Sequence, residues 1–236
     1  MTASAVAWER LRPTDVAALL ADFDAPWWIA GGWALDLFLD AETRPHGDVD
    51  VAVLRRDQLA LHRLLRTWDL RYATAEHTLA RWDGQPLALP VHGVWARRSL
   101  NPSAPWTFEV LLNEHRGDRW VYRRDPAISR ELDDLGGHRN GIPYLRPEVV
   151  LLYKSKNPTR TDESDFDAVE PRLTGPARSW LREALTTCAP QHPWLERLVA
   201  AEGRAPPTRQ RRLPAAAGRT SPSRPGGGGS GRLRSP

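Results

Sequence analysis

The chain has 236 residues, of which 41% are hydrophobic and 26% are charged, and these values suit one large globular domain or two small ones. Its single cysteine, Cys188, excludes an intrachain disulfide and a zinc site built on several thiolates. The first residues lack the basic start and continuous apolar run of a signal peptide, and no apolar run is long enough to cross a bilayer. We therefore expect a cytoplasmic protein.

The positive charge of the chain is concentrated at its C-terminal end. The whole chain carries +4, but residues 201–236 contain eight arginines and one acid, a net charge of +7, which leaves −3 for residues 1–200. This segment is rich in Pro, Gly and Ser and has almost no large apolar side chains, so we expect a disordered basic tail. It is either a dispensable extension or an arm that binds a polyanion. Because the remainder is acidic, we expect neither nucleic acid nor a membrane as its partner.

Hydrophobic spacing predicts the first elements of the chain. A helix is expected within residues 1–25, because Leu11, Val16 and Leu20 recur at helical spacing, with Thr14 as its N-cap. The elements predicted next, in chain order, are a strand at 27–30, a turn at Gly31-Gly32, a helix at 33–39, a strand at 49–54 and a helix at 58–65.

The character of the sequence changes after residue 125. Before it, short segments rich in Val, Leu and Trp predict strands of a mixed sheet at 79–82, 87–94, 107–112 and 120–122. After it, helices are predicted at 147–156, 162–169 (with Thr161 as N-cap), 176–186 and 192–200. We therefore expect an α/β domain over residues 1–125, a helical subdomain over 126–200 and the basic tail over 201–236.

Two acids lie in the predicted strand at 49–54 or directly before it. Side chains alternate faces along a strand, so Asp48 and Asp50 point the same way, while Val49 and Val51 point into a core. A desolvated carboxylate is costly unless it is paired or holds a cation. Mg²⁺ usually takes one or two protein carboxylates and leaves its other positions to water and phosphate. The pattern predicts a magnesium site at Asp48 and Asp50.

The Gly31-Gly32 turn lies between a predicted strand and a predicted helix. Glycine lets the backbone come close to a ligand, and a helix N-terminus attracts anions. Neither the glycine pair nor the Asp-x-Asp pattern is specific alone. The ordered set of strand, Gly-Gly, helix, loop and Asp-x-Asp is more specific and indicates a triphosphate site facing a metal.

This ordered set resembles the aminoglycoside and lincosamide nucleotidyltransferases of the polymerase-beta-like superfamily. The resemblance rests on Gly31, Gly32, Asp48 and Asp50, is close over residues 28–53, and extends patchily to about residue 195. It implies an α+β fold, with a polymerase-beta-like core of mixed sheet and flanking helices followed by a helical C-terminal part. The amides of the two glycines would hold the nucleotide phosphates.

The resemblance also implies a third carboxylate on a later strand. Glu109, the lone acid of an apolar strand, is the best candidate for a general base; Glu114 and Asp118 are alternatives. Glu109 is otherwise an exposed residue on the solvent face of an edge strand.

Three basic residues have both a functional and a structural interpretation. Arg44 either binds phosphate or orders its loop through a salt bridge. Lys154 projects from the apolar stripe of its helix and either points toward phosphate or extends to solvent. His46 is expected to hydrogen-bond across its loop.

The function implied by the resemblance is Mg²⁺-dependent transfer of a nucleoside monophosphate, with ATP as donor, to a hydroxyl of a small cationic acceptor such as an aminoglycoside. Two alternatives remain: a nucleotidyltransferase of the toxin–antitoxin type that modifies RNA or protein, and a non-catalytic nucleotide-binding module.

Overall fold

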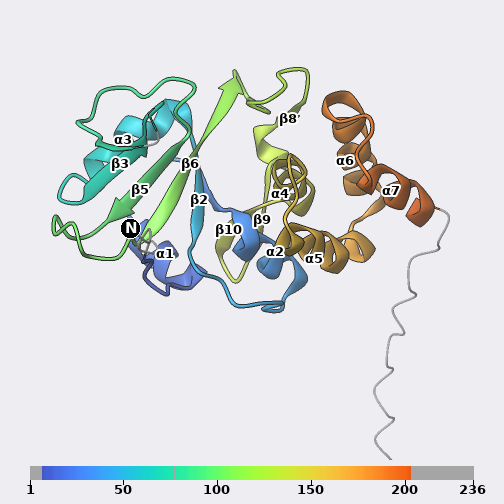
Figure 1. Ribbon diagram of the computed structural model, residues 1–236, viewed down its shortest axis with the longest axis horizontal. Coiled ribbons are helices and arrows are strands. Elements are labelled where there is room, and N and C mark those ends of the chain that lie inside the picture. The colour runs from blue at the N-terminus through green and yellow to red at the C-terminus, as the bar shows by residue number, and fades with distance from the viewer. Residues whose placement is uncertain (1–6, 77, 203–236) are drawn as a thin grey trace, which may run out of the picture. The chain divides into compact units, whose positions relative to one another are not determined.

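Strand β2 (Asp50–Leu54) lies at the centre of a mixed sheet in the computed structural model (Figure 1). It pairs in parallel with β6 (Phe108–Arg116) and in antiparallel fashion with β1 (Trp27–Ile29). The structure describes residues 7–76 and 78–202. Within them the strand order is β4-β3-β5-β6-β2-β1-β10-β9, where the additional strands are β3 (Asp69–Ala73), β4 (Leu79–Arg81), β5 (Gly93–Arg97), β9 (Gly136–Arg139) and β10 (Ile142–Leu145). Strands β7 (Arg119–Val121) and β8 (Ser129–Glu131) continue the sheet from β6.

The two faces of β6 differ in burial, as the period of two along a strand requires. Phe108, Val110 and Leu112 are buried on one face, whereas Glu109 and Leu111 on the other face are only partly buried. The buried face is part of the hydrophobic core. The partly open face is therefore the one on which polar side chains can meet a ligand.

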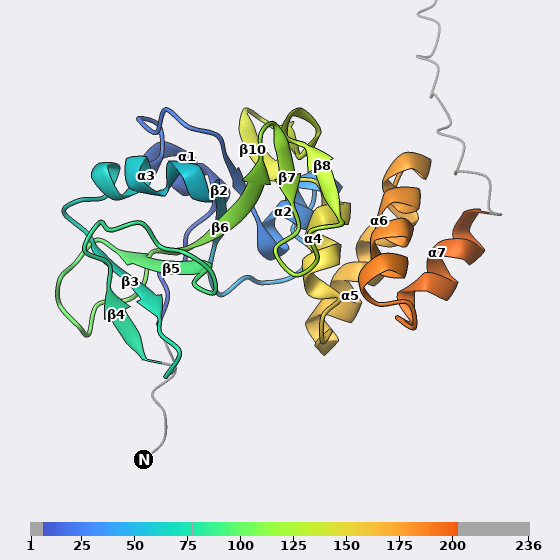
Figure 2. The same ribbon diagram turned by 90° about the horizontal axis from the view of Figure 1, so that it is seen from above.

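Seven α-helices of the described residues surround this sheet. Figure 2 shows α1 and α3 together on one side of β2 and β6, with α4 to α7 gathered at one end of the molecule. Helix α4 packs against α2, α5 and α6, and α7 packs against α6. The bounds are α1 (Pro13–Leu19), α2 (Gly31–Leu39), α3 (Gln58–Leu64), α4 (Pro147–Lys154), α5 (Arg160–Val169), α6 (Gly175–Cys188) and α7 (Trp194–Glu202). Short 3₁₀ turns lie at Arg55–Asp57, Leu132–Asp134 and Glu170–Arg172.

The α+β class, the mixed sheet and the C-terminal helices are confirmed. The segment that follows residue 125 is different from the expectation, because strands β8, β9 and β10 precede the first C-terminal helix. Strand β10 pairs in parallel with β1, so this segment belongs to the same sheet as the N-terminal strands. Strands β8 and β9 have the sequences SRE and GGHR, which lack the β-branched and aromatic residues that signal a strand.

Two other expectations near the N-terminal half were wrong. Helix α1 starts at Pro13 with Arg12 as its N-cap, rather than Thr14, and Asp15 accepts a hydrogen bond from the Arg12 amide at 2.7 Å. Proline suits this first helical position because it has no amide hydrogen to leave unpaired. The strand expected at 87–94 forms instead at Gly93–Arg97, since the expected run contains Pro90, which cannot donate to a ladder.

Helix α5 starts earlier than expected. Thr159, not Thr161, is its N-cap, and Asp162 completes a capping box by accepting a hydrogen bond from the Thr159 amide at 2.9 Å. The basic tail expected over residues 201–236 lies outside the described residues except for the last two residues of α7. None of the helices within residues 7–76 and 78–202 has the length and apolar character needed to cross a membrane.

Candidate active site

Three carboxylates converge where β2 begins beside β6. Asp50 is the first residue of β2 and lies directly opposite Glu109 in the parallel pair, so both side chains lie on the partly open face of the sheet. Asp48 precedes the strand by two residues instead of lying within it. The Glu109 amide donates a hydrogen bond to the Val49 carbonyl at 3.1 Å, which fixes the two strand starts together. The fold thus brings Asp48, Asp50 and Glu109 together.

The electrostatics of these carboxylates are unfavourable without a cation. Burial, and then the charge of Asp48, raise the pKa of Asp50 to about 7, and Lys154 opposes this shift. Burial and the charge of Asp50 raise the pKa of Glu109 to about 7, while a hydrogen bond from Trp95 opposes it. Among the described residues, neither Asp48 nor Asp50 has a side-chain hydrogen bond or an ion pair. Two neighbouring unpaired carboxylates are a suitable place for a divalent cation.

The donor set is small. No group of three or more His, Cys, Asp or Glu side chains in the part of the chain that the structure describes forms a site that could hold a metal by itself. Asp48 and Asp50 supply two carboxylates, the number that Mg²⁺ usually takes from a protein when a nucleotide supplies phosphate oxygens. The residues therefore fit a cation that is shared with a phosphate ligand better than a closed structural metal site.

Gly31 and Gly32 form the first turn of α2 and lie against the acidic group. Gly31 has a φ of +58°, and a Cβ added there would overlap the Asp50 carboxylate. A Cβ added at Gly32 would overlap the Arg44 guanidinium and the His46 ring. The N-cap residue, Ala30, has no side-chain hydrogen bond to offer the helix amides. The positive φ of Gly31 and the close approach of side chains at both positions therefore favour glycine, and the amide end of α2 is open to an anion.

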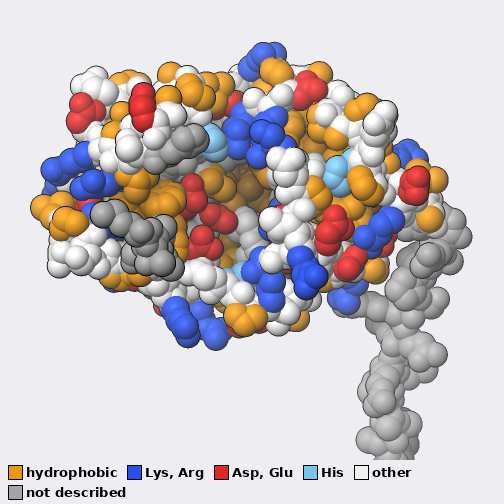
Figure 3. All heavy atoms as spheres, viewed as in Figure 1, with side chains coloured by type: hydrophobic (Ala, Val, Ile, Leu, Met, Phe, Trp, Pro, Cys, Tyr) orange, Lys and Arg blue, Asp and Glu red, His pale blue; other side chains and the backbone are white. Residues whose placement is uncertain are grey.

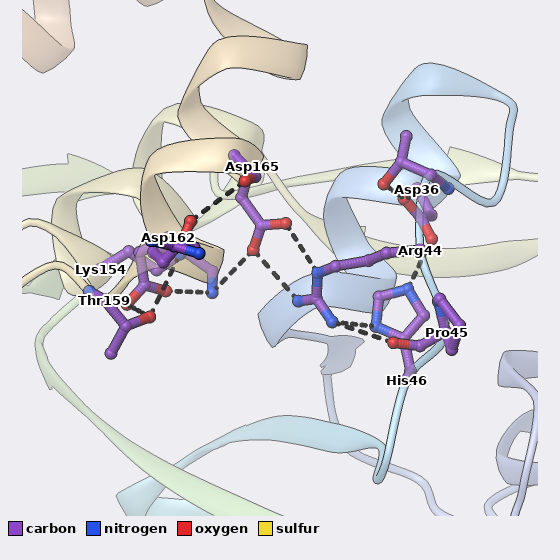
Figure 4. Close-up of polar contacts among 11 residues, drawn as sticks. Asp36, Arg44, Pro45, His46, Lys154, Thr159, Asp162 and Asp165 are labelled. Carbon is purple, nitrogen blue, oxygen red and sulfur yellow. Dashed lines mark hydrogen bonds and ion pairs between the residues drawn. The ribbon is translucent and has the colours of Figure 1, made fainter.

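Arg44 and Lys154 are held by acids of α5 (Figure 4). Arg44 binds both carboxylate oxygens of Asp165, at 2.9 and 3.1 Å. Lys154 Nζ lies 2.9 Å from Asp165 Oδ2 and 2.6 Å from Asp162 Oδ1. Asp165 thus ties the loop before Asp48 to the C-terminal end of α4, and the salt bridge expected as one interpretation of Arg44 is present.

The same loop is anchored to α2 by His46 and Thr43. His46 Nε2 donates to Asp36 Oδ2 at 2.5 Å, and Arg44 lies 3.2 Å from the other ring nitrogen. The His46 ring stacks on Trp33 at 4.3 Å between centroids, and Thr43 donates to Asp36 through its amide and hydroxyl. Figure 4 shows Asp36, His46, Arg44 and Asp165 in one continuous chain of contacts. His46 therefore makes the cross-loop hydrogen bond expected of a structural residue.

A pocket of about 550 Å³ opens beside the carboxylates. Its lining residues include Gly31, Asp50, Asn113, Arg123, Tyr153 and Lys154. A smaller pocket of about 150 Å³ shares Gly31, Asp50 and Lys154 with it and also contains Asp48 and Arg44. Figure 3 shows a hollow in this face of the molecule, with acidic side chains gathered at it and basic side chains above it.

Asp165, Arg123 and Tyr153 lie at or near this site, and the sequence analysis does not predict any of them as site residues. Asp165 lies three residues after Asp162, and such a pair shares one face of a helix. That spacing, together with a lysine on a preceding helix, is the signal that could have indicated Asp165. Arg123 and Tyr153 have no comparable signal, because they are 30 residues apart and no spacing rule brings the turn after β7 to helix α4.

The family to which the chain is matched identifies it as a nucleotidyltransferase, and the fold and the site described above are compatible with this class. A family model described as aminoglycoside-2''-adenylyltransferase matches residues 14–166, more than half of the chain, and the chain belongs to this family. The resemblance inferred from the sequence is therefore confirmed. A comparison with curated proteins finds no match.

Three of the solved structures similar to this chain share 14 to 18% identity with it. The lincosamide antibiotic adenylyltransferase LnuA, lincomycin-bound, has 14% identity and a TM-score of 0.46, covering 66% of this chain and 93% of that chain. ANT(2")-Ia in complex with adenylyl-2"-tobramycin has 16% identity and a TM-score of 0.48, covering 75% and 96%. An antigenic nucleotidyltransferase-like protein from Paracoccidioides brasiliensis has 18% identity and a TM-score of 0.43, covering 80% and 90%.

The raised pKa of Asp50 predicts how stability depends on pH. The pKa of Asp50 is about 7 in the folded protein and near 3.8 when unperturbed. Between these pH values the folded state binds more protons than the unfolded state, so the free energy of unfolding falls as pH rises through this range. In a metal chelator, Asp50→Asn should therefore be more stable than wild type at pH 8, by up to about 4 kcal/mol, with a smaller difference at pH 5. Thermal melting at both pH values measures this. Exposed Asp22→Asn is the control, and an Asp50→Asn difference that does not grow with pH would contradict the argument.

Because Asp165 bridges Arg44 and Lys154, its substitution should lower the stability of the fold. Asp165 is 4% exposed, and Asp165→Asn leaves Arg44 without its ion-pair partner and Lys154 with one of two. We expect a loss of about 3 kcal/mol in the free energy of unfolding, at the lower end of the range for a broken buried pair. Asp167→Asn is the matched control, because Asp167 lies on the same helix and pairs with Arg197 in solvent. Denaturant unfolding of both variants measures the difference, and equal losses would refute the bridge.

Proposed function

We propose that this protein transfers AMP from Mg²⁺-bound ATP to a hydroxyl of a small cationic acceptor of the aminoglycoside class, with release of pyrophosphate. The observation that carries the proposal is the meeting of Asp48, Asp50 and Glu109 at the open amide end of α2, in a chain of the aminoglycoside-2''-adenylyltransferase family. This arrangement would provide a cation site and a phosphate site at one pocket, with a base on the neighbouring strand opposite Asp50.

Asp48 and Asp50 are the residues that would hold the metal. Nucleotidyltransferases of this kind generally use a divalent metal ion, and hard carboxylate oxygens that share a ligand with phosphate favour Mg²⁺. When bound, the metal supplies Lewis-acid polarisation of the α-phosphate and charge stabilisation of the leaving pyrophosphate. The carboxylates keep it at the start of β2.

The amides of Gly31 and Gly32 would bind nucleotide phosphate oxygens. They are the first residues of α2, where the unpaired helix amides and the positive end of the helix dipole favour an anion. Arg44 and Lys154 lie beside them and border the phosphate site from the side of α5. The bridge to Asp165 fixes both side chains before the nucleotide arrives.

Glu109 would act as the general base that accepts the proton of the acceptor hydroxyl. Its raised pKa of about 7 suits a base that works near neutral pH. Trp95 lies opposite it in the β5–β6 pair and hydrogen-bonds its side chain, which holds the carboxylate in place. The proton moves from the acceptor hydroxyl to a Glu109 carboxylate oxygen as the hydroxyl attacks.

A cationic acceptor agrees with the charges around the base. Glu109, the carboxylate not assigned to the metal, supplies negative charge where the acceptor hydroxyl must lie, and residues 1–200 carry a net charge of −3. The family description names an aminoglycoside as the acceptor. A polycation is attracted to such a surface and a nucleic acid is repelled by it.

Incubation with α-labelled nucleoside triphosphates, Mg²⁺ and a panel of aminoglycosides, lincosamides and tRNA tests the proposal. Label that appears on an aminoglycoside only from ATP supports it. Label on tRNA alone would favour an RNA-modifying enzyme, and nucleotide binding without any labelled product would favour a non-catalytic module.

Removing either metal carboxylate should abolish most of the transfer. Asp48→Asn and Asp50→Asn should each lower kcat at saturating Mg²⁺ by roughly 10³-fold, since the metal contributes several kcal/mol of charge stabilisation. Both variants should remain folded, because each substitution relieves like-charge repulsion. Turnover close to wild type in either variant, with Asp22→Asn as the control for a lost surface charge, would refute the metal site.

Removing the base should separate binding from chemistry. Glu109→Gln should lower kcat by about 10²- to 10⁴-fold, the usual contribution of a general base, while the Kd for Mg²⁺-bound ATP changes little. Exposed Glu196→Gln controls for a change of charge elsewhere. Weakened nucleotide binding with undiminished turnover at saturation would remove Glu109 from this role.

A further inference from the structure

The two cations that the sequence suggested for phosphate binding are already balanced by acids. Arg44 is bound in bidentate fashion by Asp165, and Lys154 contacts both Asp162 and Asp165. These two cations and two carboxylates form a group with no net charge. Arg44 and Lys154 can therefore orient a phosphate group, but they supply little uncompensated positive charge to a triphosphate.

Arg123 is a different kind of cation in the same pocket. It lines the 550 Å³ pocket together with Gly31, Asp50 and Lys154, and it is partly buried. Within residues 7–76 and 78–202, no hydrogen bond or ion pair engages its guanidinium, which instead lies over the Tyr153 ring at 5.7 Å. Glu114, an acid whose charge acts on it, is bound to Arg55 at 2.7 Å.

The neighbouring Arg124 has a structural task that Arg123 lacks. Arg124 donates to the Tyr153 carbonyl at 2.8 Å and to the Tyr122 hydroxyl at 3.2 Å, so it caps the C-terminal end of α4. Burial, and then the Arg124 charge, lower the pKa of Arg123. A partly desolvated guanidinium beside a second one is unfavourable unless an anion joins them.

Lys156 also lines this pocket, but its side chain is exposed, where water and salt screen its charge. Arg124 also lines the pocket without a carboxylate partner, but the Tyr122 hydroxyl and the Tyr153 carbonyl hold its guanidinium. Arg123 is therefore the cation of the pocket that combines partial burial with a guanidinium engaged by no hydrogen bond or ion pair among the described residues. A guanidinium offers a planar fork that matches phosphate oxygens, and charge-assisted hydrogen bonds of this kind are among the stronger ones.

We propose that Arg123 binds the polyphosphate of the nucleotide and supplies it with positive charge that no carboxylate balances. The inference rests on the proposed function, since it takes the pocket beside Asp50 as the nucleotide site. It differs from the sequence expectation, because the main phosphate cation comes from the end of β7 rather than from the loop at Arg44 or the helix at Lys154.

Calorimetric titration of the full chain with Mg²⁺-bound ATP, tripolyphosphate and adenosine tests this. Arg123→Gln and Arg123→Met remove the charge, and the methionine keeps an unbranched side chain over Tyr153. Both should weaken binding of ATP and of tripolyphosphate by about 10- to 100-fold, the effect of one charged hydrogen-bonding group, and leave adenosine binding unchanged. Arg123→Lys should restore part of the loss because it keeps the charge without the fork.

Arg63→Gln is the matched control, since Arg63 is exposed on α3 and lies outside both pockets. It should bind all three ligands as wild type does. The melting temperature of each variant is measured alongside, and the charge-removing variants should melt no lower than wild type, because no ion pair of Arg123 is lost. If one of them fails to fold, the other decides.

The outcomes separate the inference from the function on which it rests. If wild type binds neither ATP nor tripolyphosphate, the proposed nucleotide site fails. If wild type binds both and the charge-removing variants bind them equally well, Arg123 alone is excluded. If those variants lose affinity for adenosine but not for tripolyphosphate, Arg123 stacks on the base and the phosphate assignment is overturned.

Discussion

Repulsion among three carboxylates at the start of β2 and β6 is the constraint on which the rest of the site depends. Asp50 and Glu109 are held opposite each other by the parallel strand register, so they cannot separate without breaking the centre of the sheet. The pKa of each is raised to about 7 by burial and by the neighbouring charge. Burial and mutual repulsion of these carboxylates are unfavourable in the unliganded protein. A bound cation would offset both effects, which is a reason for the fold to hold the carboxylates together.

The surrounding acids keep the nearest cation, Lys154, from forming an ion pair with Asp50. Lys154 lies close enough to oppose the pKa shift of Asp50, yet its ion pairs are with Asp162 and Asp165. Asp162 is itself fixed by the capping box of α5. The helical end of the chain therefore holds Lys154 away from Asp50 and keeps the carboxylates available for a metal.

The sequence is sufficient to predict the parts of the site that are local in the chain. The glycine pair and the Asp-x-Asp pattern lie within 20 residues, and period-two spacing predicts that both acids point the same way. It is insufficient where the pairing is distant: Asp165 lies 121 residues after Arg44, and no spacing rule links them. The strands Ser129–Glu131 and Gly136–Arg139 are not predicted because their short polar sequences are stabilised by neighbouring strands and not by their own propensity.

These unpredicted strands have a direct consequence for the chemistry of the pocket. Strand β7 pairs with both β6 and β8, so the segment that follows it is directed back toward the C-terminal end of α4, where Arg124 caps the helix. Arg123 is the residue before that cap, and its position over Tyr153 follows from the same turn of the chain. Asp50 at the start of β2 and Arg123 in the turn after β7 thus line one pocket. A cation beside carboxylates that suit a phosphate-bound metal agrees with the nucleotide substrate of a nucleotidyltransferase, because the guanidinium attracts the phosphates and the metal screens them from the acids.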